Sequence, residues 1–291
     1  TWDFDALVEG WNIDDLEEWG VDLDLDKFEE LKAEEDDFEI ELPKATKTVL
    51  GDLYEIGEHR LLCGDSTTTD SYIKLMDGEF ADMVLTDPPY NVDYVGKTKE
   101  AMTIENDSMG NDDFYNFLYD FYTAISTVTK KGGAIYVWHA SSEIINFAKA
   151  MVDAGWLFKQ QLIWVKNALV MGRQDYHWRH EPCLYGWLGG GSHKWYGDRR
   201  QSTVIEWDKP LRNGEHPTMK PVGLFAIQIQ NSSKAGDIII DAFGGSGTTM
   251  VASHQLGRRC YTLELDPKYC DVIINRMIKL DPNLRIKRNG V

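Results

Sequence analysis

The stretch Ile238-Ile239-Ile240-Asp241-Ala242-Phe243-Gly244-Gly245-Ser246-Gly247-Thr248-Thr249 decides the fold. Its three isoleucines predict a buried strand, its glycines predict a tight turn, and Thr248 or Thr249 suits the start of a helix. Glycine lets the backbone approach a ligand closely. A strand, a glycine turn and a helix in this order predict the ligand-binding edge of an open α/β sheet.

An acidic residue follows this turn at the distance expected for a nucleoside site. Glu264 ends a predicted strand at residues 260–263, about 20 residues beyond the turn, where a Rossmann-like site holds ribose hydroxyls. Met250 replaces the third glycine of a dinucleotide fingerprint, and the turn is not followed by Gly-Lys-Ser/Thr, so NAD and ATP are disfavoured. Thr248 breaks the nucleophile-elbow spacing, so Ser246 is interpreted as a turn residue.

A second informative stretch, Thr86-Asp87-Pro88-Pro89-Tyr90-Asn91, follows an apolar run. The run Ala81–Thr86 predicts a buried strand, so Asp87 should stand at its carboxyl end. Pro88 and Pro89 stop the strand and lack N–H groups, so nearby carbonyls can point outward beside the Asp87 carboxylate. Such acceptors suit an exocyclic amine, and Tyr90 offers a flat face for stacking a base. The alternative is a proline-capped strand end with a core tyrosine.

These motifs together resemble the amino-group DNA methyltransferases that use S-adenosyl-L-methionine, which carry Asp-Pro-Pro-Tyr as catalytic motif and Phe-x-Gly-x-Gly as cofactor motif. The catalytic motif comes first here, as in the permuted beta group. That group's His-Pro-Thr-x-Lys-Pro segment is matched by His216-Pro217-Thr218-Met219-Lys220-Pro221. The resemblance covers roughly residues 49–280 and departs from the usual pattern at Ala242, where family members often carry proline.

The resemblance implies a reaction and a set of site residues. The methyl group would pass to the exocyclic N6 of a flipped adenine by direct displacement, without a covalent enzyme intermediate. The implied catalytic residues are Asp87, Pro88, Pro89 and Tyr90. The implied cofactor-binding residues are Asp65, Thr218, Lys220, Asp241, Phe243, Gly245, Ser246, Gly247, Thr248 and Glu264.

Three alternatives to adenine methylation stay open to different degrees. Asp at the first motif position favours adenine in the family, whereas Ser is commoner in cytosine-N4 enzymes, so N4-cytosine methylation is the second enzyme interpretation. Protein and RNA methyltransferases typically carry Asn before the prolines and have the cofactor motif first, which argues against that class. The interpretation outside enzymes is a non-catalytic DNA-binding module, and the intact Asp87, Gly245, Gly247 and Glu264 argue against it.

Alternating strand and helix patterns predict an α/β fold. Only one βαβ unit's worth of sequence follows the glycine turn, so the other strands must lie upstream. We expect strands at residues 60–63, 81–86, 134–138 and 161–165, and helices at residues 113–129 and 142–154, the first ending in Lys130-Lys131-Gly132-Gly133. The prediction is a Rossmann-like methyltransferase fold: a mostly parallel twisted sheet with helices on both faces, plus a small target-recognition insertion.

Charge divides the chain into an acidic tail or linker at residues 1–45 and a methyltransferase domain at residues 46–291. The tail holds 18 acidic and 3 basic residues, so it carries −15 of the total charge of −18. The block Glu34-Glu35-Asp36-Asp37 should be solvated. A competing hypothesis is that the tail covers a basic cleft as an autoinhibitory DNA mimic, in which case deleting residues 1–45 would tighten DNA binding at low salt.

The tail and the lack of an initiating methionine together indicate a fragment or a processed product. The tail resembles the linker that follows a ParB-like domain in some phage and prophage methyltransferases. The predicted partner is double-stranded DNA, and a homodimer and an upstream ParB-like domain are left open. No apolar run is long enough to span a bilayer and no signal peptide is visible, so the predicted location is the cytoplasm of a bacterial or phage-infected cell.

Within the domain, a catalytic half at residues 46–166 and a cofactor half at residues 216–291 flank the expected target-recognition insertion at about residues 167–215. Residues 166–220 hold 9 Lys/Arg against 6 Asp/Glu, which favours phosphate contact. The predicted DNA contacts are Arg173, Arg179, Arg199 and Arg200. Trp187 and Trp207 are expected instead to fill a small core within the insertion.

Two further features bear on chemistry near the site. Cys63, Cys183, Cys260 and Cys270 form no CxxC pair, so they predict reduced core thiols rather than a metal site or disulfides. Residues 94–111 directly follow the catalytic motif and have no strong periodicity. They predict a mobile loop that orders over the flipped base, with an ordinary surface loop as the alternative.

Overall fold

The computed structural model describes residues 32–36, 38–92, 108–171, 175–208 and 219–291. The chain divides into two compact units, residues 1–32 and residues 33–291, and every helix and strand named below belongs to the second unit.

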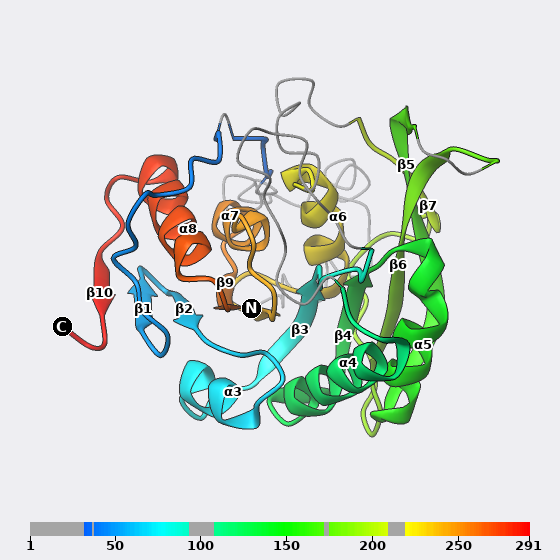
Figure 1. Cartoon of the computed structure of the whole chain (residues 1–291), viewed down its shortest axis with the longest axis horizontal. Helices are drawn as coiled ribbons and strands as arrows, with labels where there is room; N and C mark the ends of the chain where they lie inside the picture. Colours follow the sequence, from blue (N-terminus) through cyan, green and yellow to red (C-terminus); the bar gives the residue numbers. More distant parts are fainter. Residues whose placement is uncertain (1–31, 37, 93–107, 172–174, 209–218) are drawn as a thin grey trace, which may run out of the picture. The chain divides into compact units, whose positions relative to one another are not determined.

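One ten-stranded sheet organises this unit, with strand order β10-β1-β2-β9-β8-β3-β4-β6-β5-β7 among the residues described (Figure 1). Its strands are β1 (Leu53–Ile56), β2 (His59–Cys63), β3 (Ala81–Thr86), β4 (Thr129–Trp138), β5 (Trp156–Val170), β6 (Trp178–Leu188), β7 (Val204–Glu206), β8 (Ile238–Asp241), β9 (Arg259–Glu264) and β10 (Ile286–Arg288). Strands β2, β9, β8, β3 and β4 are mutually parallel, whereas β6 is antiparallel to both β4 and β5.

Helices cover both faces of the sheet, as the sequence predicted (Figure 1). One face carries α3 (Thr69–Met76), α4 (Asn111–Ser126) and α5 (Ile144–Asp153), the last preceded by a 3-10 turn at Ser141–Glu143. The other face carries α6 (Val222–Ser232), α7 (Thr248–Gln255) and α8 (Pro267–Leu280). The predicted α/β fold with a mostly parallel sheet is confirmed.

Strand β4 shows why both faces need a cover. Tyr136 and Trp138 belong to the core cluster that includes α6, α7 and α8, whereas Ile135 and Val137 belong to the cluster that includes α3, α4 and α5. All four side chains are buried, as expected for a central strand whose alternate residues enter two different cores.

The strand order places the ligand-binding position between β3 and β8. After β3 the chain continues through α4 to β4 on one side, whereas after β8 it continues through α7 to β9 on the other side. Open α/β sheets bind ligands outside the carboxyl ends of the strands where connections diverge in this way. We call the edge at which β2, β9, β8, β3 and β4 end the carboxyl-end edge.

The start of β4 corrects one predicted boundary. The helix expected at residues 113–129 ends at Ser126, and β4 begins at Thr129, so Lys130-Lys131-Gly132-Gly133 lies in the strand rather than closing the helix. These residues form an irregularity, because Thr129 pairs with Ala81 but the next paired residue of β4 is Ala134. Gly132 permits this excursion with a φ of +82°.

The segment expected to form a separate target-recognition insertion contributes directly to the central sheet. Strand β6 lies between β4 and β5, and its Cys183 and Leu184 are fully buried. Trp187 and Trp207 are partly buried and pack against the core cluster that contains α6, not against a small core of their own. The predicted boundaries at residues 167–215 therefore cut through a hairpin of the main sheet.

Candidate active site

Asp87 and Tyr90 follow β3 at the carboxyl-end edge, where the sequence predicted them. The Tyr90 hydroxyl donates a hydrogen bond to Asp87 Oδ1 at 2.5 Å. Between them, Pro88 is buried and Pro89 is partly exposed. The carboxylate and the aromatic ring of the motif are therefore fixed relative to each other.

Lys220 reaches the same carboxylate from the segment before α6. Its ammonium group donates to Asp87 Oδ2 at 2.6 Å and to the Tyr90 hydroxyl at 2.9 Å. The side chain is only 5% exposed, so this ammonium is held inside the protein. The sequence analysis grouped Lys220 with the cofactor-binding residues. In the structure its ammonium group forms an ion pair with Asp87.

Glu181 on β6 is a half-buried member of the site that the sequence analysis did not single out. Its Oε2 lies 3.0 Å from Lys220 Nζ, and its Oε1 forms an ion pair with Lys166 Nζ on β5. Four charges thus alternate as Lys166, Glu181, Lys220 and Asp87, and they sum to zero. We call these four residues the lysine–carboxylate network.

Burial and pairing act against each other in this network. Burial raises the pKa of Glu181, but Lys220 and Lys166 outweigh that effect and bring the pKa to about 2. Burial lowers the pKa of Lys220, but Asp87 and Glu181 outweigh it, so the net shift is upward. For Asp87, burial and the charge of Glu181 raise the pKa more than Lys220 lowers it. Lys220 is therefore an ammonium at neutral pH, with hydrogen bonds to Asp87 and Tyr90 and an ion-pair contact with Glu181.

A strand pairing, rather than a motif, brings Glu181 to this place. Cys183 pairs with Trp138 near the end of β4, and β6 runs antiparallel to β4, so Glu181 lies at the carboxyl-end edge. The only signal in the sequence was a charged residue directly before the apolar run Pro182-Cys183-Leu184-Tyr185.

Asp241, at the end of β8, connects the glycine turn to the Asp87 segment. Its Oδ1 accepts hydrogen bonds from the Thr86 hydroxyl at 2.7 Å and from the Phe243 N–H at 3.1 Å. Its Oδ2 accepts from the Thr249 hydroxyl at 2.6 Å. Since Thr86 directly precedes Asp87, one hydrogen bond joins the two predicted motifs across β3 and β8.

Glu264, at the end of β9, supports the glycine turn from the other side. Its two carboxylate oxygens accept from the N–H of Gly245 at 2.7 Å and the N–H of Asp266 at 2.9 Å. Burial raises the pKa of both Asp241 and Glu264 to about 7, and the hydrogen bonds offset this only in part. Two carboxyl groups that titrate near neutrality therefore flank the turn.

Asp65 lies just beyond the end of β2, which is the next strand along the same edge. It follows β2, whose Cys63 pairs with Glu264 of β9. Its Oδ1 accepts hydrogen bonds from the N–H and the hydroxyl of Thr67, both at 2.8 Å. The structure thus brings Asp65, Glu264 and Asp241 to successive strand ends.

The glycine turn itself needs glycine at two positions. Gly245 has a φ of +49° and Gly247 a φ of +84°, values that other residues rarely adopt. A Cβ at Gly245 would meet nothing within 4 Å, whereas one at Gly247 would lie 3.2 Å from Ile273. The turn is therefore open beside Gly245 and packed beside Gly247.

The other residues of the turn have structural partners. The ring of Phe243 packs against Phe117 and Phe121 of α4, with ring centroids 5.8 and 5.0 Å away. Arg276 of α8, which sequence reasoning did not single out, donates to the Ser246 carbonyl at 2.9 Å and to the Thr248 hydroxyl at 3.2 Å. Its guanidinium is buried and ties the turn to α8.

The acidic block expected to be solvated is bound to this side of the domain. Asp36 forms two hydrogen bonds of 2.7 Å with Arg276. The carboxylate of Glu35 accepts from the N–H groups of Val222 and Gly223 at the start of α6, each at 3.0 Å. The expectation was wrong for Asp36, because the buried guanidinium of Arg276 attracts its carboxylate, whereas Glu35 stays exposed while it binds the N-terminus of α6.

The four arginines predicted to contact DNA separate in the structure. Arg179 is exposed at the start of β6, and its Nε donates to the carbonyl of Lys166 at 3.1 Å, beside the lysine–carboxylate network. Arg199 and Arg200 are exposed in the segment between β6 and β7, where Arg200 pairs with Asp198 at 2.9 Å. Arg173 lies outside the described residues.

Two other predictions fall partly or wholly outside the described residues. These are Thr218 and most of the loop at residues 94–111. Where the description resumes, Asn91 accepts from the N–H of Met109 at 2.5 Å and donates to its carbonyl at 3.2 Å. Asn91 has a φ of +56°, which Asn tolerates better than most residues. The two ends of this segment are thus joined.

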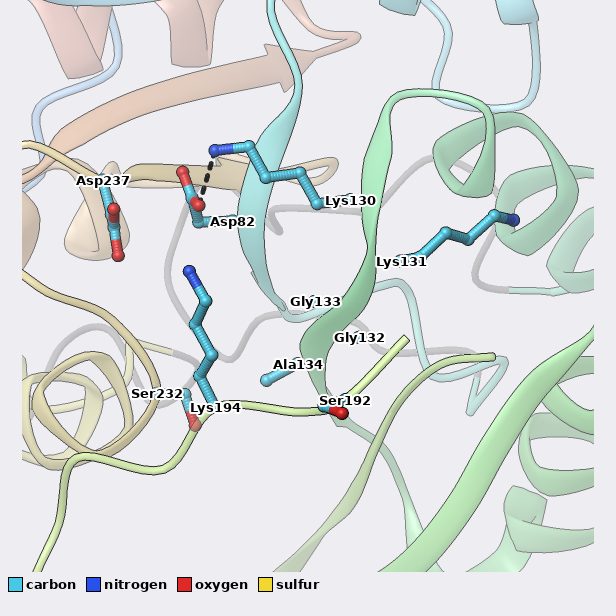
Figure 2. Close-up of a pocket in the computed structure, with 10 residues that line it drawn as sticks. All are labelled: Asp82, Lys130, Lys131, Gly132, Gly133, Ala134, Ser192, Lys194, Ser232 and Asp237. Atoms are coloured by element: carbon cyan, nitrogen blue, oxygen red, sulfur yellow. Dashed lines mark hydrogen bonds and ion pairs between the residues drawn. The ribbon is translucent and has the colours of Figure 1, made fainter. Parts of the chain in front are cut away.

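A pocket of about 110 Å³ lies away from these residues (Figure 2). It is lined at the amino ends of β3, β4 and β8, where Asp82 and Lys130 form an ion pair of 2.6 Å. This pocket is at the edge opposite to Asp87.

Over the described ranges, no group of three or more His, Cys, Asp or Glu could hold a metal ion, and no helix is long and apolar enough to cross a membrane. The four cysteines are free and buried, as predicted.

Residues 81–276 match the family model described as DNA methylase, which covers both N6- and N4-type enzymes. The chain belongs to this DNA methylase family. Enzymes of the family use S-adenosylmethionine as methyl donor.

Two curated proteins are similar to this chain in sequence. In sequence, the chain is 25% identical to the type II methyltransferase M2.MboI of Moraxella bovis, over 70% of this chain and 83% of the relative. It is 24% identical to the DNA adenine methyltransferase YhdJ of Escherichia coli K12, over 70% and 79%.

Solved structures confirm the Rossmann-like methyltransferase fold. The complex of M1.HpyAVI with S-adenosylmethionine superposes with a TM-score of 0.57 at 20% identity, covering 75% of this chain and 98% of that chain. The cytosine-N4-specific PvuII DNA methyltransferase superposes with a TM-score of 0.58 at 16% identity, covering 79% and 91%.

Proposed function

We propose that this DNA methylase transfers the methyl group of S-adenosylmethionine to the exocyclic N6 of a flipped adenine. The observation that carries the proposal is the hydrogen bond from Thr86 to Asp241, 2.7 Å long. It fixes the acceptor for an amine, Asp87, beside the turn that suits a nucleoside cofactor. The two halves of a methyl-transfer site are thereby held at neighbouring strand ends.

The residues at the glycine turn fit S-adenosylmethionine. When bound, this cofactor supplies a methyl group on a positively charged sulfur. Asp241 and Glu264 have pKa values of about 7, so a nearby positive charge would favour their ionised forms. The turn is open where a side chain at Gly245 would stand, which leaves room for close approach of a ligand. Glu264, at the end of β9, is proposed for the ribose hydroxyls, and Asp65, just beyond the end of β2, is proposed to lie near the adenine of the cofactor.

The amine of the base is a poor nucleophile because its lone pair is conjugated with the ring. Hydrogen bonds from the amine to Asp87 and to the Pro88 carbonyl would favour a tetrahedral nitrogen with a localised lone pair. Tyr90, whose hydroxyl is tied to Asp87, would hold the flipped base by stacking. The nitrogen then displaces the sulfur directly, and no enzyme group forms a covalent bond with the substrate.

Adenine is preferred over cytosine because Asp stands at the first position of the motif, as is usual for adenine enzymes in the resemblance described above. The sequence relative YhdJ is named as an adenine methyltransferase, which supports the same choice. N4-cytosine methylation uses the same amine chemistry and is the alternative that the experiment must separate.

The test is transfer of labelled methyl groups to unmethylated genomic DNA by the wild type and by Asp87→Ala, with product nucleosides identified by mass. Methyldeoxyadenosine from the wild type alone is the expected result. Methyldeoxycytidine would retain the mechanism and overturn the choice of base. Cofactor binding without transfer to DNA would contradict the proposed substrate.

Arg179 is the proposed DNA-phosphate contact, because it is exposed beside the network that contains Asp87. Arg179→Ala should weaken binding to all DNA sequences alike and reduce the slope of log affinity against log salt by about 1. Arg200→Ala is the matched control, since Arg200 already pairs with Asp198. Equal effects of the two substitutions would contradict a special role for Arg179.

A further inference from the structure

Both carboxylate oxygens of Asp87 already have partners. Oδ1 accepts from the Tyr90 hydroxyl and Oδ2 accepts from the Lys220 ammonium. A base amine that uses Asp87 as its acceptor must therefore share or replace one of these partners. Lys220 has a second carboxylate within reach, because Glu181 Oε2 lies 3.0 Å from its Nζ.

The position of Glu181 removes the main obstacle to that exchange. A buried ammonium that lost its only carboxylate would be strongly unfavourable. Lys220 stands between two carboxylates, so it keeps one negative partner when Asp87 accepts from another group. Glu181 is itself balanced by Lys166, so the exchange leaves every buried charge of the network paired.

We propose that Glu181 is a positioning residue for methyl transfer: it retains Lys220 while Asp87 turns its Oδ2 acceptor to the target amine. The inference rests on the proposed function, because the target amine is the group that replaces Lys220. Glu181 acts through Lys220 and contacts neither the base nor the cofactor. Lys166 supports it by holding its second oxygen.

The first variant is Glu181→Gln, which keeps the shape of the side chain and removes its charge. Lys220 should then stay with Asp87, its only remaining carboxylate, and compete with the target amine. We expect kcat to fall and the KM for DNA to rise, with kcat/KM about tenfold lower or more, while the Kd for S-adenosylmethionine is unchanged. Glu181→Asp, which restores a carboxylate, should recover part of the loss.

A charge-balanced variant separates the effect of Glu181 on the position of Lys220 from its effect on the stability of the protein. Glu181→Gln alone leaves the ammonium groups of buried Lys220 and half-buried Lys166 with one carboxylate between them, which should lower the melting temperature. Lys166→Gln combined with Glu181→Gln leaves one ammonium and one carboxylate, so its melting temperature should return toward that of the wild type. We expect the defect in kcat/KM to persist in this double variant. Full recovery would overturn the proposal, because Glu181 would then matter only for charge balance.

A double-mutant cycle tests whether Glu181 acts through Lys220. In the background of Lys220→Met, adding Glu181→Gln should change kcat/KM little, because the group that Glu181 positions is gone. Multiplicative losses would overturn the proposal. Failure of the proposed function has a different signature: the wild type itself would bind S-adenosylmethionine but transfer no methyl group to DNA, and the present inference would fall with it.

Discussion

Two groups of buried or half-buried carboxyl groups stand at neighbouring strand ends of this sheet, and their partners differ. Asp87 and Glu181 are held by the ammonium groups of Lys220 and Lys166. Asp241 and Glu264 are held by hydroxyl and backbone N–H groups, which carry no charge. The two groups lie close enough for the Thr86 hydroxyl, one residue before Asp87, to reach Asp241.

The difference in protonation is clearest between Glu181 and the pair Asp241 and Glu264, because burial also raises the pKa of Asp87. Two lysines hold the pKa of Glu181 at about 2 despite its burial, whereas neutral donors leave Asp241 and Glu264 at about 7. A carboxylate with an internal cation is already balanced. A carboxyl group without one can become a carboxylate when a cationic ligand arrives, which suits the side proposed for a sulfonium cofactor.

Replacing Asp87 by Ala should have the largest effect on catalysis. It should have little effect on the region of Asp241 and Glu264. The substitution removes the amine acceptor, so we expect kcat/KM for DNA methylation to fall about 10²–10³-fold, or about 3–4 kcal/mol, by analogy with losing one preorganised donor. The Kd for S-adenosylmethionine, measured by calorimetry, should stay within a factor of about three. Asp87→Asn retains one acceptor oxygen and should keep more activity than Asp87→Ala. A parallel loss of cofactor binding would show that the two regions do not act separately.

Replacing Asp241 by Ala should act first on stability. Two buried threonine hydroxyls and the Phe243 N–H would lose their acceptor, so the free energy of unfolding should fall by about 2–3 kcal/mol. Asp241→Asn keeps an acceptor oxygen and should cost less than about 1 kcal/mol in chemical denaturation. Its affinity for S-adenosylmethionine should nevertheless decrease, because it cannot carry a negative charge. Equal stability of the two variants would contradict the role of these hydrogen bonds.

The sequence predicted Asp241 and Glu264, which are held by neutral donors, better than the ion-paired lysine–carboxylate network. The reason is physical. Asp241, Glu264 and the glycines lie within one βαβ unit, so their spacing along the chain reflects their spacing in space. Strand β3 was predicted with its observed bounds, because a short apolar run ended by two prolines leaves little freedom.

The lysine–carboxylate network joins segments that are distant in sequence. Glu181 reaches Lys220 only because β6 inserts between β4 and β5 in antiparallel orientation, and no local pattern specifies that pairing. Arg276 was missed for the same reason, since a single arginine on an amphipathic helix usually faces solvent. Long-range electrostatic partners require the topology first.

The pH dependence of cofactor binding should distinguish the two regions further. Asp241 and Glu264 lose their protons as the pH rises through about 7, and their ionised forms attract a cation, so the Kd for S-adenosylmethionine should decrease from pH 6 to pH 8. The change should approach about tenfold per pH unit for each group that releases a proton on binding. Calorimetry in buffers of different ionisation enthalpy would detect that release. Asp241→Asn and Glu264→Gln should each flatten the profile, and a flat profile for the wild type would contradict the linkage.

The stability of the free protein should change in the opposite sense as the pH rises from about 4 to about 7. The folded-state pKa values of Asp241 and Glu264 lie above their ordinary values of 3.8 and 4.5, so the folded state binds these protons more tightly. Their contribution to stability is present at low pH and is lost as the pH rises through about 7. Saturating S-adenosylmethionine should reduce this loss, whereas Glu181→Gln should not alter it, because Glu181 is already ionised throughout this range.

Asp36→Asn should give the smallest effect, and only on the side of the glycine turn. The substitution keeps one acceptor oxygen for Arg276 but removes the charge that balances its buried guanidinium. Because Arg276 also holds Ser246 and Thr248, we expect the affinity for S-adenosylmethionine to fall a few-fold, about 1 kcal/mol, with kcat at saturating cofactor unchanged. Glu35→Gln is the matched control in the same segment, since it contacts the start of α6 and not the turn. If Asp36→Asn instead lowered kcat at saturating cofactor, the acidic segment would influence the Asp87 side as well, and the two groups of carboxylates could not be treated as separately held.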